Sequence, residues 1–281
     1  MATTAVLRLK SRITNLMARN ATLEDANRFH QLLSAAVARL SQDLGVIVFQ
    51  KRNGQHFILA CLYTTIIQST RECVHLMSEP TITLPTVQRS ILEAYADLRA
   101  LLSDADHGQR MLATFQAEKR RYLKSMIESA SNPYHQNMAL HIDPNVELSK
   151  VNVEIAQFAQ SGHKPMRTNK ERFRWAGLEH EHESYYWQLC LESHNSVAAL
   201  ETRHVVKHRD GDYDLIAVKD NDIQDVCRWC DALFRILIDA TLRLYEFLGI
   251  RRVAECERDL HDINTLTTDL FGPDSFVRKT C

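Results

Sequence analysis

The sequence predicts an all-α protein, built as a single bundle of about seven helices with a short irregular insertion. The chain has only 8 Gly and 6 Pro among 281 residues, whereas turn-dense β folds need these residues at many corners. Apolar residues recur at helical spacing, as at Leu33, Leu40 and Leu44. With 45% hydrophobic and 25% charged residues, the chain has ample material for a helical core.

The expected helices of the N-terminal part have recognisable starts. Residues 1–20 are basic, contain no acid and lack the continuous apolar core of a signal peptide, so we expect a structural helix there. A second helix should start at Thr22, with Asp25 in its first turn. A break at Gly54 precedes a third helix at Gln55–Met77.

Two more helices and a loop should follow. Pro85 suits the first turn of a helix that ends near Leu102. Asp104 is expected to cap the next helix, which reaches about Ala130. Ser131–Pro144 is expected to form a loop.

The second half alternates helices with irregular segments. Ser161–Trp175 is basic and is expected to be irregular, and Asp210 with Gly211 marks a turn. Gly249 should stop a long amphipathic helix. The helices expected here are Val146–Ala159, Glu181–Val206, Asp222–Leu248 and, more weakly, Ala254–Leu266. We divide the chain into N-terminal helices (1–52), a helical core domain (53–250) and a C-terminal extension (251–281).

Charge and cysteine usage restrict the environment and the partners. The net charge of −1 gives no global field toward nucleic acid or membrane, so any RNA contact needs a local basic patch. Seven Cys without a disulfide spacing predict a reduced, cytoplasmic setting. The longest apolar stretch, Phe57–Ile67, is too short to span a bilayer, so no membrane association is expected.

Two helices carry polar residues at positions that suggest a site. Arg89 and Glu93 are four residues apart and share a helix face, where the alternative is an ordinary surface ion pair. Tyr186, Cys190 and His194 form one stripe on the expected helix at 181–206. His194 should lie near a buried face, either as a hydrogen-bonded core residue or as a general acid or base.

A third candidate is the pair Arg203 and His208, which fits an Arg-x4–6-His pattern. In metal-independent ribonucleases such a pair stabilises phosphate charge and moves a proton. The alternative is a chance match, because cationic residues are favoured at helix ends. His180 and His182 suggest a metal, but a solvated helix start explains them better.

No cofactor and no metal are expected. Phosphate-loop, paired-glycine dinucleotide, Gly-x-Ser-x-Gly and His-Glu-x-x-His motifs do not occur in the sequence. Cys227 and Cys230 stand alone within a helix and are expected to be core residues.

Three stretches together carry a resemblance: Thr86–Leu98, Tyr186–Ser196 and the long helix that ends at Leu248. Over roughly residues 55–250 the chain resembles the bacterial family catalogued as domain of unknown function 5677. The resemblance implies an all-helical fold that is distantly similar to HEPN domains. Many HEPN domains are RNA-cleaving toxins or phage-defence effectors, and others are catalytically inactive partners.

Two functions follow as expectations. In the first, the chain is a metal-independent endoribonuclease that acts as a dimer. His194 or His208 moves the proton, Arg89 and Arg203 stabilise phosphate charge, and Glu93 orients its neighbours. The substrate-binding residues would be Tyr186, Lys164, Arg167, Lys170, Arg172 and Arg174. In the second, the chain is a non-catalytic helical module that binds a partner protein or small ligand in a bacterial defence or regulatory system. RNA, a homo-oligomer or a partner protein are the expected partners.

Overall fold

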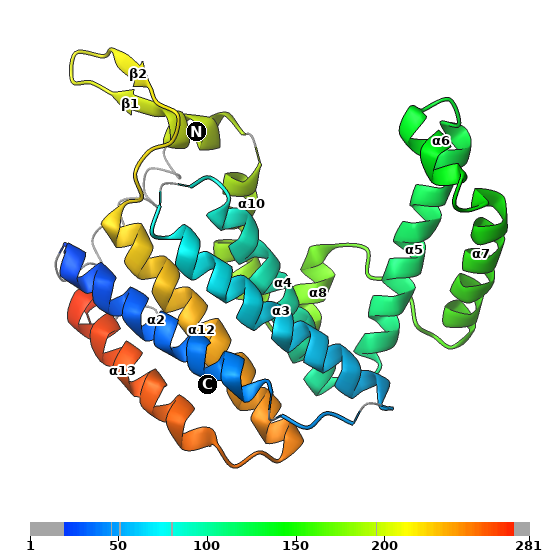
Figure 1. Cartoon of the computed structure of the whole chain (residues 1–281), viewed down its shortest axis with the longest axis horizontal. Helices are drawn as coiled ribbons and strands as arrows, with labels where there is room; N and C mark the ends of the chain where they lie inside the picture. The colour runs from blue at the N-terminus through cyan, green and yellow to red at the C-terminus, as the bar shows by residue number, and fades with distance from the viewer. Residues whose placement is uncertain (1–19, 46, 51, 80, 195, 273–281) are drawn as a thin grey trace.

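Helix α12 (Ile223–Leu248) forms the centre of a helical bundle. It packs against α2 (Leu23–Asp43), α3 (Gly54–Leu76), α4 (Leu84–Ser103) and α13 (Val253–Phe271). These five helices run side by side in Figure 1. The computed structural model describes residues 20–45, 47–50, 52–79, 81–194 and 196–272.

One apolar core holds the bundle together. Buried side chains from every helix of the bundle contribute to it, among them Phe29, Tyr63, Ile91, Phe234 and Ile263. The phenol of the buried Tyr63 has its polar end satisfied, because its hydroxyl lies 2.9 Å from Thr241 Oγ1. Residues from all three expected parts of the chain therefore share one core.

A second unit projects from the bundle as an arm (Figure 1). It consists of α5 (His107–Glu128), α6 (Pro133–Ala139) and α7 (Pro144–Gln160). Helices α5 and α7 pack against each other around a small apolar cluster of their own, centred on Leu123 and Met126. We call α5, α6 and α7 the arm.

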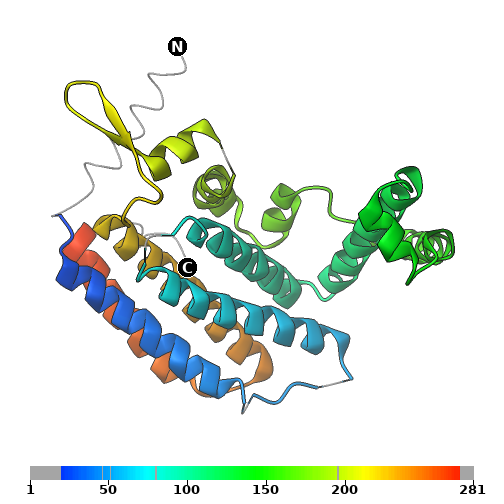
Figure 2. The same ribbon diagram turned by 45° about the horizontal axis from the view of Figure 1, so that its top comes forward.

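The chain then returns to the bundle. Four short segments follow one another here: α8 (Asn169–Trp175), α9 (Glu179–Glu181), the π-helix η1 (His182–Tyr186) and α10 (Trp187–Ser193). Of these, α8 and α10 lie against α4. Next come α11 (Val197–His204) and an antiparallel hairpin of β1 (Val205–Lys207) and β2 (Tyr213–Leu215). Figure 2 shows the hairpin and the arm at opposite ends of the molecule.

The structure confirms the all-α class and several helix signals. Thr22 caps α2 through a reciprocal pair of hydrogen bonds with Asp25. Pro85 lies in the first turn of α4, and α12 ends at Gly249 in the left-handed conformation, with φ of 68°. The helix expected within residues 1–20 lies outside the described residues, except for Asn20.

The expected number of about seven helices was wrong. One expected helix is divided in two, and two segments that were expected to be irregular form short helices. The helix expected over 181–206 is interrupted after Ser193, and Ser196 caps a separate helix by accepting a hydrogen bond from Ala199 N. Helix α6 occupies the loop expected at 131–144, and α8 occupies part of the segment expected to be irregular. Each of these two helices has only seven residues, too few for a clear apolar period.

Asp104 does not cap α5. It ends α4, and its carboxylate accepts hydrogen bonds from Asp106 N at 2.9 Å and Arg110 Nη1 at 2.8 Å. The short turn between α4 and α5 is thereby fixed by side-chain contacts. In the part of the chain that the structure describes, no helix combines the length and the apolar character needed to cross a membrane.

Replacing Thr22 by Ala should lower the free energy of unfolding by about 1 kcal/mol, because the first turn of α2 loses an acceptor for its backbone N–H groups. Urea denaturation measures the change. Thr22→Ser keeps the hydroxyl and should behave like the wild type. Equal losses in both variants would contradict the capping role.

Candidate functional site

Four polar side chains from three segments converge on the carboxylate of Glu93. Arg89 and Glu93 come from α4, Asn169 and Arg172 from α8, and Tyr186 from η1. We call these five residues the polar cluster. Helices α4 and α8 are direct neighbours in the fold, so tertiary packing brings together residues that are distant in sequence.

Glu93 is the common acceptor of the polar cluster. Its Oε1 accepts hydrogen bonds from Arg89 Nε at 3.0 Å and from the Tyr186 hydroxyl at 2.7 Å. Asn169 Nδ2 lies 3.4 Å from the same oxygen, and Arg172 Nη1 donates to Oε2 at 3.1 Å. A carboxylate offers about four acceptor positions, so three donors at Oε1 and one at Oε2 leave Glu93 largely engaged.

The local sequence explains why these side chains meet. Arg89, Glu93 and Asp97 follow one another at four-residue intervals and so occupy one face of α4. On α8, the fully buried Phe173 anchors the helix in the core. Its neighbour Arg172 is thereby held at the rim of the core, beside Glu93.

Arg172 also connects the polar cluster to the base of the arm. Its Nε lies 3.2 Å from Asp97 Oδ1, and that oxygen lies 3.1 Å from His107 Nε2. His107 is the first residue of α5 and is completely buried. Glu93 and Asp97 thus share one guanidinium, and the start of the arm is tied to the same network.

Burial and charge fix the protonation of the polar cluster. Burial, followed by the hydrogen bond to Glu93, raises the pKa of Tyr186 far above its usual value, so Tyr186 remains a hydrogen-bond donor. Burial alone would lower the pKa of Arg89, but its hydrogen bonds to Glu93 and Tyr186 raise it. Arg89 therefore stays charged, and its guanidinium lies 5.6 Å from the centre of the Tyr186 ring.

His182 adjoins the polar cluster through its aromatic ring. The ring stacks on Tyr186 with centroids 5.3 Å apart and an interplanar angle of 20°, and it meets Phe173 edge-on. Its Nδ1 is buried and has no hydrogen-bond partner among the described residues. Burial, with Lys170 nearby, lowers the pKa of His182, so the ring is neutral at pH 7 and able to accept a proton.

The free energy of unfolding should decrease in acid partly because of His182. Below its ordinary pKa of 6.5, the unfolded chain binds a proton that the folded chain still excludes, so this contribution is complete above that pH and is lost as the pH falls toward the lowered pKa. Urea midpoints at about pH 7 and about pH 5.5 should therefore differ less for His182→Gln than for the wild type. His180→Gln, an exposed neighbour, is the control. An equal acid loss in His182→Gln and wild type would contradict this assignment.

The expected position of His194 was wrong. His194 lies at the end of α10 with an extended backbone and an exposed side chain. Among the described residues it forms no hydrogen bond or ion pair with Arg89 or Glu93. The helix ends at Ser193 because the polar run at 193–196 favours side-chain capping over helix continuation. Any catalytic role of His194 remains a prediction.

Arg203 and His208 lie on different elements. Arg203 is on α11, whereas His208 follows β1 and pairs with Asp214 across the hairpin at 2.9 Å. Arg203 Nη2 is buried without a hydrogen-bond partner in the described part of the chain. No contact joins Arg203 or His208 to the polar cluster within that part, so their role also remains a prediction.

The expected RNA-binding residues divide into two groups. Tyr186 and Arg172 belong to the polar cluster. The other four are exposed on the segment that leads into α8 and on α8 itself: Lys164, Arg167, Lys170 and Arg174. Lys170 Nζ lies 3.6 Å from Glu183 Oε1, a distance typical of a weak surface pair.

The remaining candidates are accounted for by packing. Cys227 and Cys230 are fully buried, as expected of core residues. His180 is exposed, while His182 is packed against the polar cluster. The described residues contain no group of three or more His, Cys, Asp or Glu side chains that could hold a metal ion.

Sequence reasoning missed Asn169, Asp97, His107 and His182 as members of the site. Two signals could have revealed Asp97 and the helix that carries Asn169. Polar residues at 89, 93 and 97 form a stripe on a helix that is largely buried. Thr168 with Glu171 has the spacing of a helix cap, and the Thr168 hydroxyl does accept a hydrogen bond from Glu171 N.

The fold and the site define an all-helical protein in which a partly exposed arginine and glutamate cluster sits between α4, α8 and η1. The sequence matches the family of unknown function DUF5677 over residues 56–213. This match covers more than half of the chain and includes the whole polar cluster, so the chain belongs to that family. No curated protein and no solved structure shows a significant match.

Proposed function

We propose that this protein is a helical ligand-binding module whose polar cluster recognises a phosphate group of its ligand. One observation carries the proposal. Two guanidinium groups, on α4 and α8, are oriented by a single carboxylate while their side chains remain 28% and 21% exposed, for Arg89 and Arg172 respectively.

The geometry of the two arginines supports recognition of an anion. Planar guanidinium groups match the oxygens of phosphate, and charge-assisted hydrogen bonds are stronger than neutral ones. Arg172 Nη1 donates to Glu93 and Asn169, and its buried Nε forms an ion pair with Asp97 at 3.2 Å without a hydrogen bond. Among the described residues no hydrogen bond engages its Nη2. Because Glu93 already holds both arginines in place, little conformational entropy is lost when a ligand binds.

The local charge supports the same proposal. Two arginines and two carboxylates, Glu93 and Asp97, nearly cancel within the site. The four exposed cations at 164, 167, 170 and 174 outnumber the one carboxylate of that segment, Glu171. Among the described residues only Lys170 of these four has a weak partner, Glu183, so a surplus of positive charge remains on the segment that carries Arg172. An anionic ligand would be attracted by that surplus.

The test is binding of a short fluorescein-labelled single-stranded RNA, followed by anisotropy in EDTA, with inorganic phosphate as a competitor. Wild type should bind, binding should weaken with salt, and Arg89→Gln should weaken it about tenfold. Arg121→Gln is the control, since Arg121 is 77% exposed on the arm. The proposal fails if neither RNA nor phosphate binds, or if Arg89→Gln binds like wild type.

A second candidate is the metal-independent endoribonuclease that the family resemblance implies, with a toxin or phage-defence role. The neutral His182 favours it, because a proton acceptor then stacks on Tyr186, whose hydroxyl shares the Glu93 carboxylate with both arginines. In this candidate His182 accepts the proton, and Arg89 with Arg172 stabilises the phosphate charge. The similarity to HEPN domains is part of this candidate.

Gel analysis of the same RNA separates the two candidates. An endoribonuclease should cleave in EDTA, and His182→Gln should abolish cleavage while RNA still binds. His194→Ala and Arg203→Ala test the assignments made from sequence: loss of cleavage in these variants but not in His182→Gln would return proton transfer to His194 and stabilisation of phosphate charge to Arg203. RNA that binds and stays intact would exclude the endoribonuclease and leave the binding module.

The expected association with a second copy or with a partner protein also remains a proposal. Light scattering of the wild-type protein with and without RNA tests it. A molar mass of twice the 32.3 kDa chain would support a dimer, and the mass of a single chain under both conditions would contradict it.

A further inference from the structure

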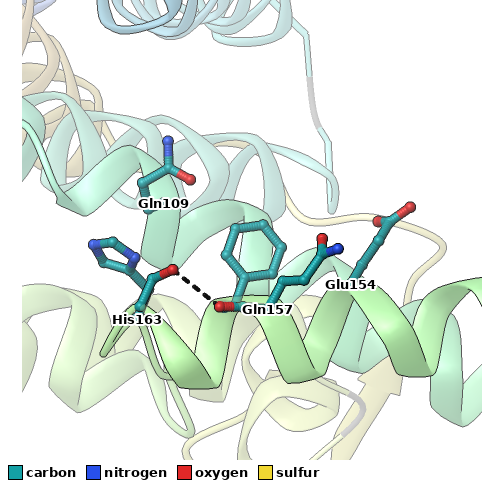
Figure 3. Close-up of a pocket in the computed structure, with 6 residues that line it drawn as sticks. Gln109, Glu154, Gln157 and His163 are labelled. Atoms are coloured by element: carbon teal, nitrogen blue, oxygen red, sulfur yellow. Dashed lines mark hydrogen bonds between the residues drawn. The ribbon is translucent and has the colours of Figure 1, made fainter.

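A hollow of about 670 Å³ lies at the base of the arm, between the first turn of α5 and the last turns of α7. Figure 3 shows Gln109 on one side and Gln157 with Glu154 on the other, with His163 closing one end. The lining is Gln109, Glu154, Gln157, Phe158, Ser161 and His163. We propose that this hollow binds a neutral, planar heterocycle of the nucleobase or nucleoside class.

The hollow exists because the apolar contact between α5 and α7 stops before the base of the arm. At the far end, Leu123, Met126 and Val151 fill the space between the two helices. Toward the base, α7 ends at Gln160, and Gly162, with φ of 80°, turns the chain away. Two helices that pack closely at one end therefore leave a polar space at the other.

The lining side chains define the class of ligand. The carboxamides of Gln109 and Gln157 each offer both donors and an acceptor, which suits the edge of a heterocycle. The half-buried ring of Phe158 offers a flat apolar face for stacking. The volume falls within the range of about 300–1,000 Å³ that is usual for small-molecule sites.

The charge of the lining side chains favours an uncharged base or nucleoside over a nucleotide. Glu154 contributes a carboxylate, and His163 Nε2 lies 3.6 Å from Asp106 Oδ1. The lining described by the structure includes no Lys and no Arg. A phosphate in the hollow would meet a negative charge without a cation to balance it, so we expect the uncharged ligand to bind better.

The inference goes beyond the proposed function, because none of the lining residues belongs to the polar cluster. The probes are adenosine, guanosine, cytidine and uridine, and their 5′-monophosphates. Binding is followed by NMR at the side-chain amide signals of Gln109 and Gln157, so that phosphate binding at Arg89 and Arg172 is not mistaken for it.

At least one nucleoside should shift both amide signals, with a dissociation constant below about 1 mM. Its 5′-monophosphate should bind more weakly at these signals. Gln109→Ala and Phe158→Leu should each weaken nucleoside binding about fivefold or more. Gln136→Ala, exposed on α6 at the far end of the arm, should leave it unchanged.

The proposal is overturned if no nucleoside shifts these signals at about 5 mM, or if Gln109→Ala binds like wild type. Because Gln109 is exposed, its replacement should leave the fold intact even if Phe158→Leu destabilises the arm. Tighter binding of a monophosphate than of its nucleoside at the same signals would contradict the charge argument.

Discussion

Replacing Arg172 by Leu should lower the free energy of unfolding by about 2–4 kcal/mol, as measured by urea denaturation. Arg172 is the guanidinium shared by Glu93 and Asp97. Its removal leaves two carboxylates close together without their common partner. Breaking a fully buried pair costs about 3–5 kcal/mol, and we expect less here because the Arg172 side chain is 21% exposed.

Arg174→Leu is the matched control for this prediction. Arg174 lies on the same helix, two residues further on, and is exposed. Its replacement should change the free energy of unfolding by no more than about 0.5 kcal/mol. Equal losses in the two variants, or no loss in Arg172→Leu, would show that Arg172 does not hold α8 to α4.

Phe173→Ala should be still more destabilising, by about 3–5 kcal/mol, because it removes a fully buried aromatic side chain. The ring of Phe173 lies 4.7 Å from that of Tyr186 and 5.3 Å from that of His182. Its loss should therefore also weaken RNA binding, since Tyr186 and Arg172 would no longer be held in place. Thermal and urea unfolding, followed by the anisotropy assay, measure both effects.

Phe57→Ala serves as the control for the aromatic deletion. Phe57 is 61% exposed on α3, so its removal should change stability by no more than about 0.5 kcal/mol. If Phe173→Ala lowered the free energy of unfolding as little as Phe57→Ala, Phe173 would not anchor α8. It would then not be the residue that holds the polar cluster in place.

The sequence points to three of the five residues of the polar cluster by their spacing, and it names Arg172 only as one of several RNA-binding cations. Arg89 and Glu93 are recognisable as a pair because a helix with a clear apolar stripe fixes which residues share a face. Tyr186 is recognisable from the same kind of pattern. The contribution of α8 is harder to predict. Its seven residues form a basic segment with a single buried residue, Phe173, so the segment shows no apolar periodicity.

The error at His194 has a different cause. Helical spacing places His194 one turn beyond Cys190, but that reasoning holds only while the helix continues. Ser196 instead caps a new helix, and the stripe ends before it reaches His194. Long-range neighbours such as Asp97 and His107 on one side and Arg172 on the other are set by tertiary packing, which residue spacing within one helix does not report.

The central claim is that Arg89 and Arg172 together receive a phosphate group, and NMR of the arginine Nε–H signals tests it most directly. On titration with inorganic phosphate, the Nε–H signals of Arg89 and Arg172 should move together and saturate with a common dissociation constant. The signal of Arg121, on the arm, should not move. Unchanged signals for Arg89 and Arg172, or equal movement of all three, would contradict the claim.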